Sequence, residues 1–181
     1  HRPIPKLAVR AASLILTALS ALVCEARAST LVVPDQAPTV QAALDAGVDT
    51  ILVQAGTYPE TSTVSTPVAL LGMVSDGAAY PVVGGLVINV QPSDKLLFNF
   101  QRITITNQIT IISDNGVCDF SFNQCDIRNG IDDASIWGDT GNISLFKCSV
   151  QGYVDLRARH WIVVDSCDVK AGQITACGPG P

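Results

Sequence analysis

One eight-residue pattern, repeated four times between Phe98 and Val169, constrains the fold of this chain more than any other feature. Each copy begins with two apolar residues spaced one residue apart, and it ends with Ile or Cys, any residue, and Ile or Val. The four copies are residues 98–105, 120–127, 143–150 and 162–169. Their equivalent Ile or Cys positions, called here the ladder positions, are Ile103, Cys125, Cys148 and Cys167, separated by 22, 23 and 19 residues. Alternating, strand-like units that recur about every 20 residues predict stacked β-coils.

A second apolar position follows each ladder residue. It lies six positions later in three copies, at Ile109, Ile131 and Val154, and one position later still in the fourth copy, at Ile174. Pairs of turn-type residues lie between, at 107–108, 129–130, 151–152 and 171–172. We therefore expect each coil to carry a second strand in register with the next coil. The sequence predicts an all-β parallel β-helix whose ladder residues point into the core.

Residues 29–72, which precede the repeats, predict a capped end for this stack. Residues 30–33 and 50–54 are short apolar strands. Between them Thr39 can cap a helix over residues 40–46, with Gly47 as its natural end. One stripe of the helix is apolar and holds Val40, Ala43 and Leu44. Because terminal repeats must not expose apolar rungs, we expect this helix to cover the end of the β-core.

The same stretch carries a family resemblance. A helix at 39–46, a strand at 51–53, the run Gly56-Thr57-Tyr58-Pro59-Glu60 and a strand at 67–72 follow in this order. They resemble the opening of the pectin-lyase-like right-handed parallel β-helix proteins, which include pectinesterases and many secreted bacterial proteins of no assigned activity. The resemblance implies a right-handed parallel β-helix (a solenoid) with a short N-terminal capping helix. The expected divisions are a cap and first coil at 29–72, β-helix coils at 73–176, and a linker start or truncation point at 177–181.

Residues 1–28 have the features of a secretory signal peptide. Arg2, Lys6 and Arg10 precede an apolar or small run at 11–23, and Ala26-Arg27-Ala28 offers a cleavage site. We expect a secreted protein, extracellular or at the cell surface, with the periplasm as an alternative and no transmembrane segment after signal removal. The remaining chain has 7 Lys and Arg against 15 Asp and Glu. That balance excludes nucleic acid as a partner.

Five cysteines remain after signal removal, and three of them are ladder residues. Neighbouring coils lie about 4.8 Å apart, which suits the Cα separation of a disulfide, but parallel Cβ vectors hold the sulfurs too far apart for one. We interpret Cys125, Cys148 and Cys167 as stacked core thiols, with an inter-coil disulfide or a metal site as alternatives. The sequence leaves the pairing of Cys118 and Cys177 open.

Polar residues on the expected outer face give the candidate ligand-binding residues. Asp126 and Arg128 follow the second ladder residue, and Asp168 and Lys170 follow the fourth. The two pairs are expected about 10 Å apart, across two rungs. Carboxylates beside cations on a flat face can bind sugar hydroxyls or a uronate. The alternative is a solvated strip of salt bridges that keeps the face soluble.

A second cluster supplies candidate catalytic residues, namely Asp133, Asp155 and Arg157. The family resemblance suggests their possible roles. Polysaccharide lyases use carboxylates to hold Ca²⁺ against a uronate and a cation to abstract a proton, whereas glycoside hydrolases use paired carboxylates. Calcium is therefore the cofactor to consider, and no other cofactor or protein metal site is expected.

The leading functional hypothesis is a secreted or cell-surface β-helix scaffold that binds extracellular polysaccharide and has no catalytic activity in this chain. The alternative is the N-terminal part of a polysaccharide lyase, a glycoside hydrolase or a pectinesterase-like enzyme. The pattern of the repeats specifies the fold and leaves the activity open, because the ladder residues set the register of the coils while any recognition must come from the outer columns.

Overall fold

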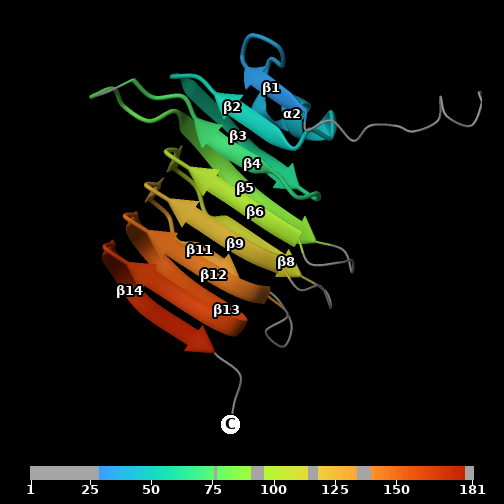
Figure 1. The fold of residues 1–181 in the computed structure, drawn as a ribbon. Helices are drawn as coiled ribbons and strands as arrows, with labels where there is room; N and C mark the ends of the chain where they lie inside the picture. Colours follow the sequence, from blue (N-terminus) through green and yellow to red (C-terminus); the bar gives the residue numbers. More distant parts are fainter. Residues whose placement is uncertain (1–28, 76, 91–95, 114–117, 134–139, 178–181) are drawn as a thin grey trace, which may run out of the picture.

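The computed structural model describes residues 29–75, 77–90, 96–113, 118–133 and 140–177. The elements are β1 (Thr30–Val33), α2 (Val40–Asp45), β2 (Thr50–Val53), β3 (Thr57–Val64), β4 (Ala69–Gly72), β5 (Val82–Val90), β6 (Leu96–Gln101), β7 (Thr104–Ile105), β8 (Ile109–Ser113), β9 (Cys118–Asn123), β10 (Asp126–Ile127), β11 (Ile131–Asp133), β12 (Thr140–Phe146), β13 (Ser149–Asp165) and β14 (Asp168–Cys177). The pairings between these strands are parallel, and each strand pairs with its equivalents in the neighbouring turns (Figure 1).

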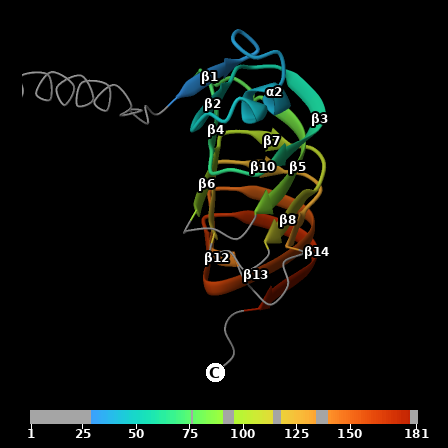
Figure 2. The same ribbon diagram turned by 90° about the vertical axis from the view of Figure 1, so that its right-hand side faces the viewer.

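The strands form two parallel sheets on opposite sides of the stack (Figure 2). Sheet A runs in the order β1, β2, β4, β6, β9, β12 and the second part of β13. Sheet B runs from β3 through β5, then the pairs β7/β8 and β10/β11, to the first part of β13 and β14. Because β13 pairs first in sheet B and then in sheet A, the chain passes from one turn to the next without a break. The predicted all-β parallel β-helix is confirmed.

Helix α2 lies at the β1 end of the stack (Figures 1 and 2). The Oγ1 of Thr39 accepts a hydrogen bond from the amide of Ala42 over 3.0 Å, which caps the first turn. Its buried residues are Val40, Ala43 and Leu44, the apolar stripe seen in the sequence. The helix ends just before Gly47, whose φ of 68° suits glycine. The short N-terminal helix is thus formed as predicted, one residue shorter than expected.

Apolar columns fill the space between the sheets. In sheet A, Phe98 stacks on Phe120 with ring centroids 5.1 Å apart, and Phe100 stacks on Phe122 at 5.0 Å. All four side chains are at most 1% exposed. In sheet B the column Leu86, Ile109, Ile131 and Val154 is in register and buried. The backbone of Ile174 pairs with Val154 after a register shift that follows Gly152, which explains the extra residue in the fourth copy of the pattern.

The ladder residues also form a column inside the stack. Ile103 is fully buried, Cys125 and Cys148 are each 2% exposed, and Cys167 is partly buried. Among the described residues, Cys118, Cys125, Cys148 and Cys167 form no disulfide; the side chain of Cys177 lies outside them. The predicted inward-facing column is confirmed for Cys125 and Cys148, and Cys167 lies at its partly exposed end.

The repeated pattern spans a corner between the sheets, and this differs from the single strand that the sequence suggested. The first half of each copy lies in sheet A and its last two residues lie in sheet B. The residue before each ladder position has a left-handed backbone: Arg102 (φ 54°), Gln124 (53°), Lys147 (51°) and Ser166 (56°). A side chain in this conformation costs about 1 kcal/mol. We call these four stacked residues the corner column.

A second bend, inside sheet B, depends on glycine. Gly130 lies between β10 and β11 with φ 87°, and a Cβ there would collide with the carbonyl group of Tyr153 in the next turn. The turns predicted at residues 151–152 and 171–172 do not interrupt the strands. The first pair of residues belongs to β13 and the second pair to β14. Gly84 and Gly85 likewise lie inside one continuous strand, β5.

The ends of the chain bear on two further predictions. The expected signal peptide at 1–28 and most of the expected linker at 177–181 lie outside the described residues, which include only Cys177 of the latter. In the described part of the chain, no helix has the length and apolar character needed to cross a membrane.

Candidate functional site

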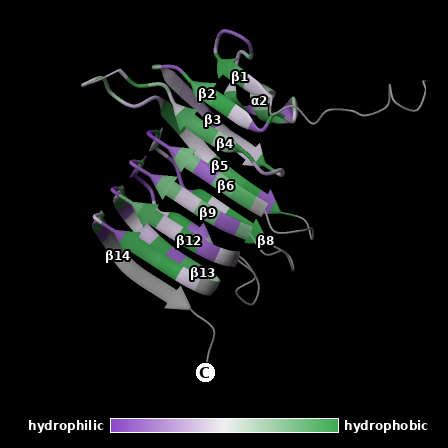
Figure 3. Cartoon of the chain, in the orientation of Figure 1, coloured by the Kyte–Doolittle hydropathy of each residue, from purple (hydrophilic) through white to green (hydrophobic). Residues whose placement is uncertain are grey.

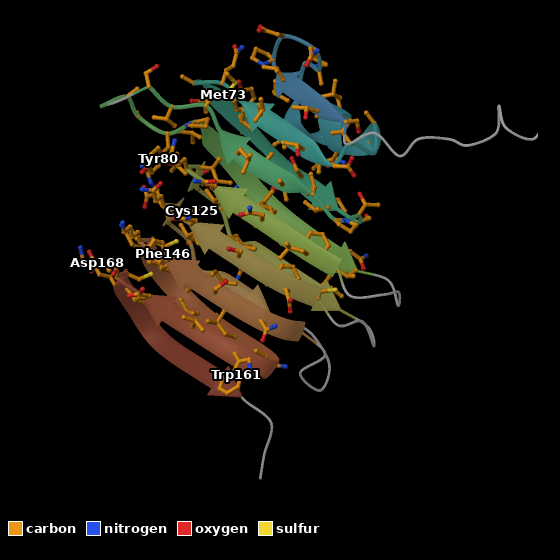
Figure 4. All side chains as sticks on the ribbon, in the orientation of Figure 1. Met73, Tyr80, Cys125, Phe146, Trp161 and Asp168 are labelled. Atoms are coloured by element: carbon orange, nitrogen blue, oxygen red, sulfur yellow. The ribbon has the colours of Figure 1, made fainter. Side chains whose placement is uncertain are left out.

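The corner column borders two adjoining hollows. The first has a volume of about 510 Å³ and is lined by Tyr80, Arg102, Gln124 and residues of the loop between β4 and β5. The second, about 580 Å³, shares Arg102 with the first and adds Gln54 and Met73. Figure 4 shows Met73 and Tyr80 on the same edge of the stack as Cys125, Phe146 and Asp168. The hollows therefore open at one end of a longer edge formed by successive corners.

The hollows combine a guanidinium, amides and an aromatic ring. Nε of Arg102 donates a hydrogen bond to Oε1 of Gln124 over 3.1 Å, which ties two successive corners together. Within the described residues Arg102 has no carboxylate partner, so most of its five N–H donors stay available to a ligand. A guanidinium binds carboxylates in a bidentate fashion, and amide and phenol groups hydrogen-bond hydroxyls.

The column stays polar along its length. Lys147 is exposed, and its Nζ lies 5.0 Å from the ring centroid of Phe146, which is 37% exposed. Ser166 Oγ donates to Oδ1 of Asp165 over 3.0 Å. Figure 3 shows hydrophilic residues at the tips of successive turns along this edge, next to strands rich in apolar residues. A cation and a partly exposed ring thus recur below the hollows.

The predicted acid–base pairs lie in sheet B immediately after the corner column. Nε of Arg128 is 2.9 Å from Oδ2 of Asp126, and Nζ of Lys170 is 3.0 Å from Oδ2 of Asp168. In the strand register Ser149 lies between Asp126, in the turn before it, and Asp168, in the turn after it. The two acid–base pairs are therefore two turns apart. The structure brings each acid to its own base and keeps the two pairs separate.

These pairs are exposed and satisfy each other. The side chains of Asp168 and Lys170 are 63% and 68% exposed, and those of Asp126 and Arg128 are 27% and 53% exposed. Exposed ion pairs contribute between zero and about 1 kcal/mol to stability. Because each charge already has a partner, these pairs are weaker candidates for ligand binding than Arg102.

Asp155 is the most unusual carboxylate of the described residues. It is 3% exposed, and its Oδ2 accepts from Nη2 of Arg157 over 2.9 Å and from the hydroxyl of Tyr153 over 3.3 Å. Its Oδ1 is buried and has no hydrogen-bond partner among the described residues. Desolvation and the charge of Asp155 raise the pKa of the Tyr153 hydroxyl. A buried carboxylate with one oxygen unpaired is a costly arrangement that calls for a reason.

The structure brings together two of the three catalytic candidates. Asp155 and Arg157 form an ion pair, whereas the strand register pairs Asp155 with Asp132. Asp133 instead takes the register position beside Ile111. The side chain of Asp133 lies outside the described residues.

Within the described ranges, no three or more His, Cys, Asp or Glu side chains are grouped so that they could hold a metal ion. Calcium binding, considered from the family resemblance, stays a prediction.

The thiol column contains one acidic thiol. The neighbouring thiol of Cys125 lowers the pKa of Cys148 to about 7. The same contact and burial raise the pKa of Cys125, and burial raises that of Cys167. The central thiol of a stack of three is thus the preferred position for a negative charge.

The hollows and the corner column were missed in the sequence. The available signal was that the residue before each ladder position is polar in every copy: Arg102, Gln124, Lys147 and Ser166. The left-handed backbone that projects these side chains from a corner has no sequence signature here, because none of the four is glycine or asparagine.

The chain was also compared with known proteins. No family model, no curated protein and no solved structure matches it. What is established is therefore a parallel β-solenoid, and the function has to be argued from the geometry above.

Proposed function

We propose that this protein is a secreted or cell-surface β-helix scaffold of the pectin-lyase-like kind, which binds polysaccharide along the corner column without cleaving it. The observation that carries the proposal is the hollow of about 510 Å³ in which Arg102, Gln124 and Tyr80 meet. An extended polymer suits this edge, because polar side chains recur there once per turn over four turns. Each turn offers the next stretch of polymer a further contact.

The chemistry of the column favours hydroxyl and carboxylate groups. Arg102 can hold a carboxylate or a pair of hydroxyls, while Gln124 keeps it in place. Lys147 and the exposed face of Phe146 repeat a cation and a ring further along. The paired charges at Asp126/Arg128 and Asp168/Lys170 border the same edge and keep it soluble or contribute secondary contacts.

Affinity electrophoresis tests the proposal. The protein is run through gels containing polygalacturonate, pectin, alginate or neutral dextran, with and without Ca²⁺, and the polymers are afterwards sized. We expect retardation by at least one uronate polymer, little or none by dextran, and no shortening of the polymer. Equal mobility in all four gels would contradict the proposal.

A second candidate function rests on Asp155. Its carboxylate is 3% exposed, and one of its oxygens has no hydrogen-bond partner among the described residues. The other oxygen accepts hydrogen bonds from Tyr153 and Arg157, and together these groups could carry out acid–base chemistry. This supports the alternative of an enzyme, namely the N-terminal part of a polysaccharide lyase, glycoside hydrolase or pectinesterase-like protein. Asp133 and Arg157 remain candidates in that case.

Turnover of the same polymers decides between the two candidates. Product formation from pectin, polygalacturonate or alginate that disappears in Asp155→Asn and Arg157→Ala, and survives in Asp168→Asn, would favour the enzyme and overturn the scaffold. An Asp133→Ala variant tests whether the remaining candidate takes part.

A further inference from the structure

The sulfurs of the ladder cysteines are held in equivalent positions in three successive turns. Each Sγ lies 3.4 Å from a carbonyl oxygen of the turn before: Cys125 from Phe100, Cys148 from Phe122, and Cys167 from Leu145. Since the three side chains share one orientation, their sulfurs repeat at the spacing of the strands, about 4.8 Å. The amide of Cys148 also donates to Sγ of Cys167 over 3.3 Å, which fixes that sulfur against the preceding turn.

This spacing suits a bridging atom better than a direct bond. A disulfide requires two sulfurs about 2.0 Å apart, which is less than half of the strand spacing. A metal–thiolate bond is about 2.3 Å long, so two such bonds in a line span roughly 4.6 Å. We propose that Cys148 and Cys167 bind one soft monovalent cation, such as Cu(I), as a linear bridge between two neighbouring turns.

Access selects this pair of sulfurs over the other. Cys125 and Cys148 are each 2% exposed, whereas Cys167 is partly exposed in the last described turn. A cation from solvent therefore reaches Cys167 first and then Cys148. Cys125 stands on the far side of Cys148 and completes no second linear site once Cys148 is occupied.

Ligand number and charge select the cation. Thiolates prefer Cu(I), and two of them satisfy a linear site, whereas Zn²⁺ needs four ligands and Ca²⁺ needs six or more oxygens. Binding converts two thiols to thiolates and releases two protons to solvent. The amide of Cys148 stabilises the charge on Cys167 through its hydrogen bond, and Lys147 adds a positive charge next to Cys148.

Competition with a chromogenic Cu(I) chelator tests the site. The reduced protein is titrated anaerobically, and we expect the native chain to take up one Cu(I) per molecule. Cys148→Ser and Cys167→Ser should lose this uptake, while Cys125→Ser, the matched change in the same column, should keep it. Circular dichroism verifies that each variant is folded. Uptake retained in Cys167→Ser, or none by the native chain, would overturn the proposal.

A measurement on the unaltered chain makes the test independent of folding defects. Without Cu(I), iodoacetamide should alkylate Cys167, seen by peptide mass spectrometry; with one equivalent of Cu(I) that alkylation should be lost. Unchanged alkylation would overturn the proposal. The formation of a Cys148–Cys167 disulfide with oxidised glutathione would also overturn the proposal, because sulfurs that can reach bonding distance are not held one rung apart.

Discussion

Nε of Arg102 donates to Oε1 of Gln124 over 3.1 Å, and the two residues occupy the same left-handed corner in consecutive turns. The contact means that neighbouring corners are coupled through side chains as well as through the backbone ladder. It also orients the guanidinium at the junction of two hollows. The edge is therefore a pre-arranged surface, which reduces the entropy lost when a ligand binds.

The phenylalanine stack should dominate the stability of sheet A. Phe120 is 1% exposed and stacks on Phe98, so Phe120→Ala should lower the free energy of unfolding by about 3–5 kcal/mol. Phe146→Ala is the control, because Phe146 is 37% exposed and its loss should cost less than about 1 kcal/mol. Urea denaturation followed by circular dichroism measures both. Similar losses in the two variants would show that the stack is not the core.

Two glycines with positive φ should respond differently to alanine. At Gly47 no atom lies within 4 Å of the position that an alanine methyl group would take, so Gly47→Ala should cost only the backbone strain, about 1 kcal/mol. Gly130→Ala adds a collision with the carbonyl group of Tyr153 and should cost about 3 kcal/mol. Thermal denaturation of the pair compares them. Equal shifts would mean that the bend in sheet B can relax.

The buried ion pair should matter more than the exposed one. Asp155→Asn removes the negative charge of a side chain that is 3% exposed and takes this carboxylate partner away from Arg157. We therefore expect the free energy of unfolding to fall by about 2 kcal/mol. Asp168→Asn breaks a pair whose side chains are 63% and 68% exposed and should cost less than about 1 kcal/mol. The comparison is made by urea denaturation at neutral pH. A stabilised Asp155→Asn variant would indicate that Asp155 is retained for function at the expense of stability.

The thiol column should titrate near neutral pH. The neighbouring Cys125 thiol favours the thiolate of Cys148, so the lowered pKa predicts that the thiolate appears as the pH rises through about 7. Ultraviolet absorbance of the thiolate should show this step in the native protein and lose it in Cys148→Ser. In Cys125→Ala the step should move to higher pH, because the neighbouring thiol is gone. A native titration that begins only near the ordinary thiol pKa would refute the contact.

The sequence predicted those features of the fold that depend on the periodicity of its residues. The ladder of Ile103 and Cys125 and the second apolar column at Ile109 and Ile131 follow from spacing alone, since stacking puts equivalent residues of each coil side by side. The capped helix at Val40 was equally readable, because its cap and stripe are local signals. These features are set by neighbours along the chain or by an exact repeat.

The corner and the hollows depend on long-range packing, which the pattern does not encode. Arg102 adopts a left-handed backbone because the sheets on both sides of it fix where the chain must turn. The hollows arise because the loop between β4 and β5 lies over that corner, and nothing in the composition of the loop indicates its position. Similarly, the one-residue offset between Asp132 and Asp133 decides which of them takes the register position beside Asp155, and only the strand pairing reveals it.

Isothermal titration of polygalacturonate into the native protein, Arg102→Gln and Arg128→Gln tests the central claim most directly. Arg102 has no carboxylate partner among the described residues, so losing its charge-assisted hydrogen bonds should weaken binding by about tenfold or more. Arg128 is paired with Asp126, and its replacement should leave the affinity within about twofold of the native value. Equal affinity in all three proteins, or a larger loss in Arg128→Gln, would contradict binding at the corner column.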